Sequence, residues 1–233
     1  MLKNYINNSE KLDFDEKRYE KKYVCDVYRF NNFLSWIYNF TDIKKKYSKR
    51  NIKSIYFDNY NFDSAKDNLI GLSNREKIRL RWYNNDLSQS ILEIKKKIDN
   101  FNQKNKQTIE FKKKNIFDYN IFSLMKELNT QTKIISEKNL NPIILISYDR
   151  EYYENINGIR LTIDSNLTFN RILGSNKTNF SKRIKYPRYI IELKFGQDSN
   201  YQILNFLKNA NFINTRNSKY ILGLSTLGIV FHY

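Results

Sequence analysis

The chain has 233 residues, and its 41 Lys or Arg residues against 24 Asp or Glu residues give a formal net charge of +17 at pH 7. Hydrophobic residues make up 40% of the chain, enough to build a core, so a wholly disordered protein is excluded. The single cysteine and the single histidine exclude an internal disulfide framework and a Cys- or His-based metal cluster, and they argue against Ser-His or Cys-His catalysis.

Alternation of apolar and polar residues predicts that strands dominate the chain. The predicted strands are Arg18–Tyr28, Ile52–Asp58, Arg75–Tyr83, Ser90–Ile98, Pro142–Tyr153, Gly158–Asp164 and Arg188–Phe195. Gln107–Lys113 is a weaker eighth strand, because its alternation is incomplete. The Asn- and Lys-rich segment Asp99–Lys106 is predicted to be a mobile loop.

Spacing of three and four residues between apolar side chains predicts helices over Asn31–Tyr47, Asp118–Lys138 and Ser199–Asn209. The apolar segment Tyr220–Tyr233 is too short to cross a membrane and is expected to be a final strand or a covering segment. Without a transmembrane stretch or the apolar region of a secretory signal, we expect a cytoplasmic protein. No linker divides the chain, so we expect an N-terminal tail over residues 1–17 and one domain over residues 18–233.

The polar sides of the predicted strands are unusually basic. In Arg75–Tyr83 the even positions are apolar, and the odd positions are Arg75, Lys77, Arg79 and Arg81. Ser90–Ile98 and Gly158–Asp164 repeat the pattern with Lys95 and Arg160. One interpretation is an ordinary antiparallel sheet with a solvated face. The other is a sheet closed with its apolar face outward against helices, so that its interior is a basic channel that holds an anion between like charges.

Eight segments, in chain order, carry a family resemblance. They are KKYVC (21–25), SIYFDN (54–59), IRLRWYN (78–84), LEIKKK (92–97), SYDREYY (147–153), GIRLTIDSNLTF (158–169), IIELKF (190–195) and TRNSKYI (215–221). Together they resemble the catalytic domain of the vacuolar transporter chaperone (VTC) polyphosphate polymerases, within the triphosphate tunnel metalloenzymes. The resemblance implies an α+β fold: a closed antiparallel eight-stranded β-barrel tunnel with helices packed on its outer surface.

The same resemblance implies roles for individual residues. The implied catalytic residues are Arg79, Arg81, Lys95, Arg150, Arg160 and Glu192, and the implied substrate-binding residues are Lys22, Lys194, Arg216 and Lys219. Glu192 is the implied ligand of Mn²⁺ or Mg²⁺, with Asp164 or Glu20 as a helper, because hard cations prefer carboxylate oxygen. On the weak eighth strand, either Lys106 or Lys112 could supply a further lysine.

The function implied by the resemblance is transfer of the γ-phosphate of ATP, or of another nucleoside triphosphate, onto polyphosphate or orthophosphate. The first strand lacks the alternating pair of glutamates that hydrolytic members use, which favours the polymerase branch. Two alternatives stay open: a hydrolase of inorganic, nucleoside or RNA 5′-triphosphates, and a non-catalytic polyphosphate-binding module. Nucleic acid is not an expected partner, because Trp82 and Tyr189 lie on the apolar faces of their strands and not among the arginines. The sequence leaves open whether a membrane-protein partner exists.

Overall fold

The computed structural model describes residues 19–40, 42–99, 101–174, 180–196, 214–215 and 217–229. The strands are β1 (Tyr19–Cys25), β2 (Lys44–Asp58), β3 (Arg75–Tyr83), β4 (Asp86–Ile98), β5 (Phe101–Glu110), β6 (Asn141–Glu154), β7 (Arg160–Arg171), β8 (Ile184–Tyr186) and β9 (Tyr189–Phe195). The helices are α1 (Val27–Phe40), α2 (Asp63–Ile70), the 3-10 helix η1 (Ile116–Asp118), α3 (Ile121–Gln131), α4 (Ile134–Glu137) and α6 (Lys219–Thr226).

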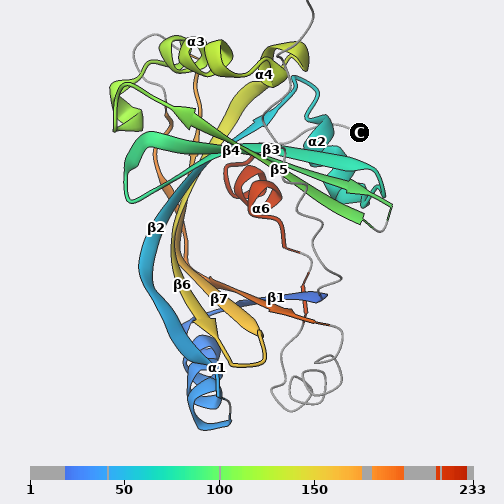
Figure 1. The fold of residues 1–233 in the computed structure, drawn as a ribbon, viewed down its shortest axis with the longest axis vertical. Helices are drawn as coiled ribbons and strands as arrows, with labels where there is room; N and C mark the ends of the chain where they lie inside the picture. Colours follow the sequence, from blue (N-terminus) through green and yellow to red (C-terminus); the bar gives the residue numbers. More distant parts are fainter. Residues whose placement is uncertain are drawn as a thin grey trace, which may run out of the picture.

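The strands form one antiparallel sheet in the order β1-β9-β7-β6-β2-β3-β4-β5, with β8 paired to β7. Register shifts interrupt the pairing of β2 with β6 and of β6 with β7, and such irregularities bend strands. Figure 1 shows the result: the long strands β2, β6 and β7 form a curved wall between the β1 end of the sheet and the β3–β5 end. The sheet therefore has a concave and a convex side.

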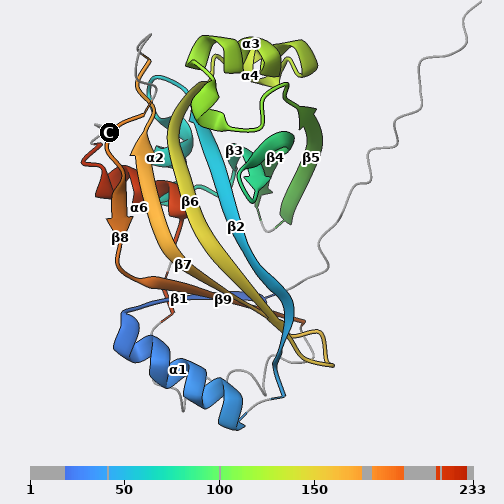
Figure 2. The ribbon, with the colours of Figure 1, turned by 90° about the vertical axis from the view of Figure 1, so that its left-hand side faces the viewer.

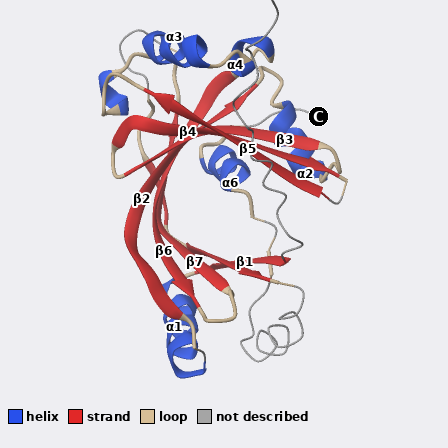
Figure 3. Ribbon diagram, in the orientation of Figure 1, coloured by secondary structure: helices blue, strands red, loops and turns tan. Residues whose placement is uncertain are grey.

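The prediction of a closed eight-stranded barrel is wrong, because the described residues form a nine-stranded sheet that does not close. β1 and β5 stand at opposite ends of the strand order, and no pairing between described residues joins them. Alternation along a strand determines which face a side chain takes, but closure depends on backbone hydrogen bonds between the two edge strands. The remaining expectation, an α+β fold with helices outside an antiparallel sheet, holds for α1, α3 and α4 (Figure 3).

The convex side of the sheet is covered at both ends by helices (Figure 2). At one end α3 and α4 pack on the outer faces of β3 and β4 through buried side chains that include Leu80, Trp82, Leu92, Leu124 and Leu128. At the other end α1 packs on β7 and β9, with Phe33, Ile37, Leu161, Ile163 and Ile191 buried. The apolar positions predicted from alternation are the ones that contact these helices, so the basic positions of the same strands are left on the concave side.

Helix α6 lies on the concave side, at the middle of the sheet (Figure 1). Its Tyr220 stacks on Tyr56 of β2, with ring centroids 5.2 Å apart, and its hydroxyl donates to the buried carboxylate of Asp58 over 2.8 Å. A Cβ atom on Gly223 would lie only 2.5 Å from Cδ1 of Ile144. Only glycine therefore lets α6 approach the sheet this closely.

Several predicted boundaries are wrong. Most of the predicted loop Asp99–Lys106 belongs to β5, and the weak eighth strand over Gln107–Lys113 is the last part of that strand and the residues after it. The first predicted helix begins earlier and ends at Phe40, because the chain returns as β2 from Lys44. The turn between β3 and β4 is a two-residue Asn84–Asn85 loop with φ of 51° and 63°, the left-handed conformation that such hairpins require.

The C-terminal predictions differ in outcome. The predicted helix Asp118–Lys138 is divided into α3 and α4, with Thr132 and Lys133 between them, and its first residue is the last of η1. The described part of Tyr220–Tyr233, residues 220–229, contains most of helix α6 and no strand, while the predicted helix Ser199–Asn209 lies outside the described residues. Among the helices that the structure describes, none is long and apolar enough to cross a membrane.

Candidate active site

The concave side carries three groups of cations, each arranged around buried or half-buried carboxylates. The first group surrounds Glu93 of β4, which is 4% exposed. Arg79 donates from Nε to Glu93 over 2.7 Å, Arg81 lies 3.4 Å away through Nη1, and Lys104 of β5 lies 3.2 Å away. Burial alone would raise the pKa of Glu93, but Arg79, Arg81 and Lys104 lower it to about 2. Glu93 is therefore ionised at neutral pH and holds two arginines in place.

Replacing Glu93 with Gln is expected to lower the free energy of unfolding at pH 7 by about 3 kcal/mol, because it leaves buried guanidinium groups without their counter-ion. Since folding lowers this pKa from 4.5 to about 2, the stabilisation is complete above pH 4.5 and is lost as the pH falls toward 2. Urea denaturation of both proteins from pH 7 to pH 3 measures this. If the difference in the free energy of unfolding between the two proteins stays the same from pH 7 to pH 3, the assigned role of Glu93 is contradicted.

The second group surrounds Asp164 of β7, which is fully buried. Arg150 of β6 binds it in bidentate fashion, with Nε 2.6 Å from Oδ1 and Nη2 2.7 Å from Oδ2. Lys219 of α6 lies 2.6 Å from Oδ2, and both cations lie over the ring of Tyr148, at 5.3 and 4.9 Å. Burial would raise the pKa of Asp164, but Lys219 and Arg150 keep it below its usual value. One carboxylate thus connects β6, β7 and α6.

The third group contains two carboxylates that share two lysines. Lys22 of β1 and Glu192 of β9 are cross-strand partners, and Nζ of Lys22 lies 4.0 Å from Glu192 and forms an ion pair with Glu20. Lys194 bridges both, at 3.0 Å from Glu192 and 3.5 Å from Glu20. Burial would raise the pKa of Glu192, but Lys194 and Lys22 outweigh it and lower that pKa. Both carboxylates are therefore available as anionic oxygen ligands.

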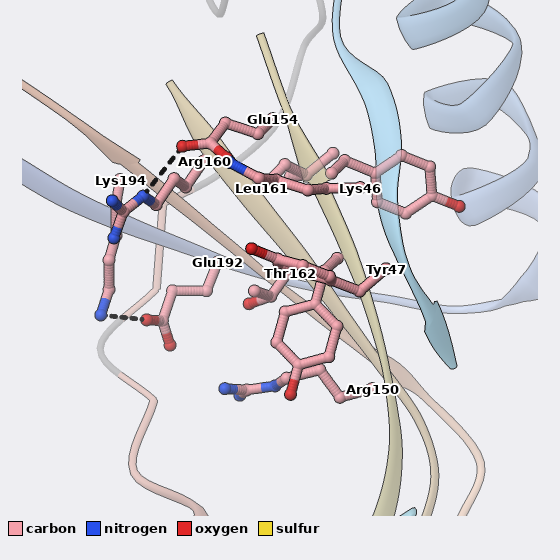
Figure 4. Close-up of a pocket in the computed structure, with 11 residues that line it drawn as sticks. Lys46, Tyr47, Arg150, Glu154, Arg160, Leu161, Thr162, Glu192 and Lys194 are labelled. Carbon is pink, nitrogen blue, oxygen red and sulfur yellow. Dashed lines mark hydrogen bonds and ion pairs between the residues drawn. The ribbon is translucent and has the colours of Figure 1, made fainter. Parts of the chain in front are cut away.

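Arg150 lines the same pocket as Glu192 and Lys194 of the third group, and this pocket has a volume of about 370 Å³ (Figure 4). Figure 4 shows Arg150, Glu192 and Lys194 along it, with Arg160 paired to Glu154. The side chain of Arg160 is 53% exposed, so it lies at the pocket mouth. Thr162, which also lines the pocket, has a buried hydroxyl without a hydrogen-bond partner among the described residues. The pocket therefore presents cations to an anionic ligand.

The carboxylates of this site fit a hard divalent cation, although the described residues hold no group of three or more His, Cys, Asp or Glu side chains that could bind a metal on their own. Glu20 and Glu192 converge on the same two lysines. Mg²⁺ and similar ions are commonly bound by one or two carboxylates together with substrate phosphates and water. Of the two helpers that the sequence left open, Glu20 lies with Glu192, whereas both oxygens of Asp164 are occupied by Arg150 and Lys219.

The structure brings most of the candidate residues to the concave side. Arg150, Arg160, Glu192 and Lys194 line the pocket. Lys22 forms ion pairs with Glu20 and Glu192, and Lys219 forms one with Asp164. Arg79, Arg81 and Lys95 lie on β3 and β4, and Arg216 lies outside the described residues. The lysine bound to Glu93 is Lys104. The sequence analysis did not name Lys104 and expected Lys106 or Lys112 to supply the further lysine. The run FNQKNKQ has no alternating apolar residues that could have marked it as strand.

Solved structures with this arrangement of strands share low sequence identity with the chain. A candidate adenylyl cyclase from Hippeastrum, described as having a dominant triphosphatase activity, is 14% identical, with a TM-score of 0.54 over 88% of this chain and 94% of that chain. A protein from Pyrococcus horikoshii OT3 is 13% identical, with a TM-score of 0.48 over 90% and 98% of the two chains. The likeness to the Hippeastrum protein shows that the two chains share a fold, here a tunnel-like α+β fold built on an antiparallel sheet.

No curated protein matches the chain. The model of the VTC domain matches residues 16–228, so the chain belongs to the VTC domain family. The resemblance to the VTC family seen in the sequence is thereby confirmed.

Proposed function

We propose that this VTC domain is a metal-dependent polyphosphate polymerase that moves the γ-phosphate of ATP onto a growing polyphosphate chain. The observation that carries the proposal is the convergence on one concave surface of arginines fixed by buried carboxylates and of a lysine-bound carboxylate pair. Phosphoryl transfer needs positioning and fixed positive charge more than it needs a covalent nucleophile from the protein. Membership of the VTC family supports condensed phosphate as the substrate.

Arg79, Arg81 and Arg150 would hold the triphosphate of the donor, with Lys95 and Arg160 at its sides. Guanidinium groups suit this role because they pair with phosphate oxygens in bidentate fashion. Glu93 and Asp164 hold these groups in position before substrate arrives, so that little reorganisation is needed on binding. The Nε of Arg81 is buried and lacks a hydrogen-bond partner among the described residues.

Lys22 and Lys194, with Arg216 and Lys219 from the C-terminal segment, would direct the acceptor chain toward the donor. Mn²⁺ or Mg²⁺ held by Glu192 and Glu20 would neutralise charge on the terminal phosphates. An oxygen of the terminal acceptor phosphate attacks the γ-phosphorus, the bond from that phosphorus to the β–γ bridging oxygen breaks, and ADP leaves. The acceptor is one phosphate longer after each transfer.

Hydrolysis of triphosphate is a second candidate function, favoured by a specific observation. Glu20 on the first strand lies beside Glu192, so a first-strand carboxylate is present near the candidate metal ligand even though the alternating glutamate pair is missing. The Hippeastrum protein with this fold is itself described as a triphosphatase. In a hydrolase, water would replace the acceptor phosphate and the cationic walls would keep the same roles.

Product analysis separates the two reactions. We expect purified protein given ATP and Mn²⁺ to accumulate long polyphosphate chains together with ADP, and to do neither when the metal is removed with a chelator. Gel electrophoresis of the polyphosphate and quantification of ADP and orthophosphate measure this. Release of orthophosphate without chains would support the hydrolase, and tight polyphosphate binding without any turnover would support a binding module.

A further inference from the structure

An aromatic pair stands among the charged side chains of the concave surface. Tyr47 of β2 and Tyr152 of β6 are direct cross-strand partners, and their rings meet edge to face with centroids 5.9 Å apart. Both line the pocket that also holds Arg150 and Glu192 (Figure 4). We call Tyr47 and Tyr152 the tyrosine pair. The pocket therefore has an aromatic wall in addition to its cations.

The tyrosine pair does not belong to the hydrophobic core. Neither ring is part of the three clusters of buried residues, and Tyr47 is 49% exposed. The neighbour that lies over both rings is a cation, Arg50, whose guanidinium carbon is 5.6 Å from the Tyr47 centroid and 5.8 Å from the Tyr152 centroid. Burial of apolar area therefore gives little reason for two aromatic rings at this place. Aromatic side chains that line a pocket are instead typical of contact with a ligand.

Strand register connects the tyrosine pair to the candidate metal ligand. Direct partners on neighbouring strands share a face of the sheet. The row of direct partners that crosses β2, β6, β7 and β9 consists of Tyr47, Tyr152, Thr162 and Glu192. Because neighbouring strands lie about 4.8 Å apart, the backbones of Tyr152 and Glu192 are about 10 Å apart. A ligand on the tyrosine pair can thus extend toward Glu192 along one face of the sheet.

We propose that the tyrosine pair binds the base of a nucleoside triphosphate by stacking, and that it makes the site prefer a nucleotide to a bare phosphate chain as the donor. That the ligand carries a triphosphate rests on the proposed function. Every nucleobase has a π face that stacks on aromatic side chains, which explains an aromatic wall beside a cationic one. Arg50 is the direct partner of Arg150, so it is placed beside the phosphate nearest to the nucleoside.

Stacking predicts a particular pattern of specificity. Preferences at a stacking site follow the stacking strength of the base, and the larger purine rings should therefore make ATP bind more tightly than CTP. Tripolyphosphate carries the charges of the ligand but has no base, so its affinity should not depend on the tyrosine pair. These two comparisons separate stacking from attraction between charges.

Calorimetric titration of the full chain with ATP, CTP and tripolyphosphate, without metal, tests the base subsite. We expect Tyr47→Leu and Tyr152→Leu each to weaken ATP binding about tenfold, to weaken CTP binding less, and to leave tripolyphosphate binding unchanged. Tyr47→Phe keeps the aromatic face and should bind ATP as the unaltered chain does. Tyr28→Leu, at a position on α1 that is 73% exposed, is the matched control outside the pocket and should change none of these affinities.

Unchanged ATP affinity in both leucine variants would overturn the base subsite, and so would equal losses of affinity for ATP and for tripolyphosphate. A loss for ATP alone, in a protein that makes no polyphosphate, would support the subsite and reject the polymerase. Synthesis of polyphosphate by a chain whose leucine variants bind ATP normally would support the polymerase and reject the subsite. The two proposals therefore fail separately.

Discussion

Replacing Glu192 with Gln is expected to reduce metal-dependent phosphoryl transfer by at least about 100-fold. The amide keeps the size of the side chain but lacks the anionic oxygens that a hard cation prefers. The same change removes one of the two counter-ions of Lys194 and of Lys22, and leaves both lysines with Glu20 alone. We therefore expect tripolyphosphate to bind more tightly than to the unaltered protein when no metal is present.

These opposite effects on turnover and on binding distinguish a metal-ligand role from a loss of folding, which would weaken both. The rate of ADP formation with Mn²⁺ and the dissociation constant of tripolyphosphate without metal are the two measurements. Glu137→Gln, at an exposed position on α4, is the matched control and should leave both unchanged. A Glu192→Gln protein that turns over at an undiminished rate would remove Glu192 from the proposed metal site.

The basic surface could be predicted from the sequence because alternation in an antiparallel strand separates the two faces. In β3, Leu80 and Trp82 are buried under α3 and α4, and Arg79 and Arg81 lie on the other side. The closure of the sheet could not be predicted in this way. Closure depends on how far the bulged strands β2, β6 and β7 bend and on whether β1 and β5 meet, and neither is visible in the order of residues along one strand.

The counter-ions were harder to predict than the cations. Glu93 occupies a polar position of β4, and nothing in the local sequence indicates that it contacts Arg79 of β3 and Lys104 of β5. Asp164 was considered as a helper for the metal, but its oxygens are occupied by Arg150 and by Lys219, 55 positions further along the chain. Such contacts arise from strand register and from the packing of a helix on the sheet, so they cannot be predicted from local sequence patterns.

Replacing Asp164 with Asn is expected to lower the free energy of unfolding at pH 7 by about 3–5 kcal/mol, because it leaves two cations buried without their counter-ion. Burial would raise the pKa of Asp164, but Lys219 and Arg150 lower it below 3.8. Its stabilisation is therefore complete above about pH 4 and is lost as the pH falls further. Urea denaturation at pH 7 and at pH 3 should show a large difference between the two proteins that shrinks at the lower pH.

A double-mutant cycle with Lys219→Met identifies what Asp164 holds in place. If the carboxylate anchors α6 through Lys219, the double variant should lose less free energy of unfolding than the two single variants lose together. The reason is that after the first change the second no longer leaves a buried charge without its counter-ion. Asp42→Asn, at an exposed position before β2, should change stability by less than about 0.5 kcal/mol. Strictly additive effects of Asp164 and Lys219 would mean that the ion pair seen at 2.6 Å does not couple α6 to the sheet. In that case Arg150 alone would account for the cost of losing the carboxylate.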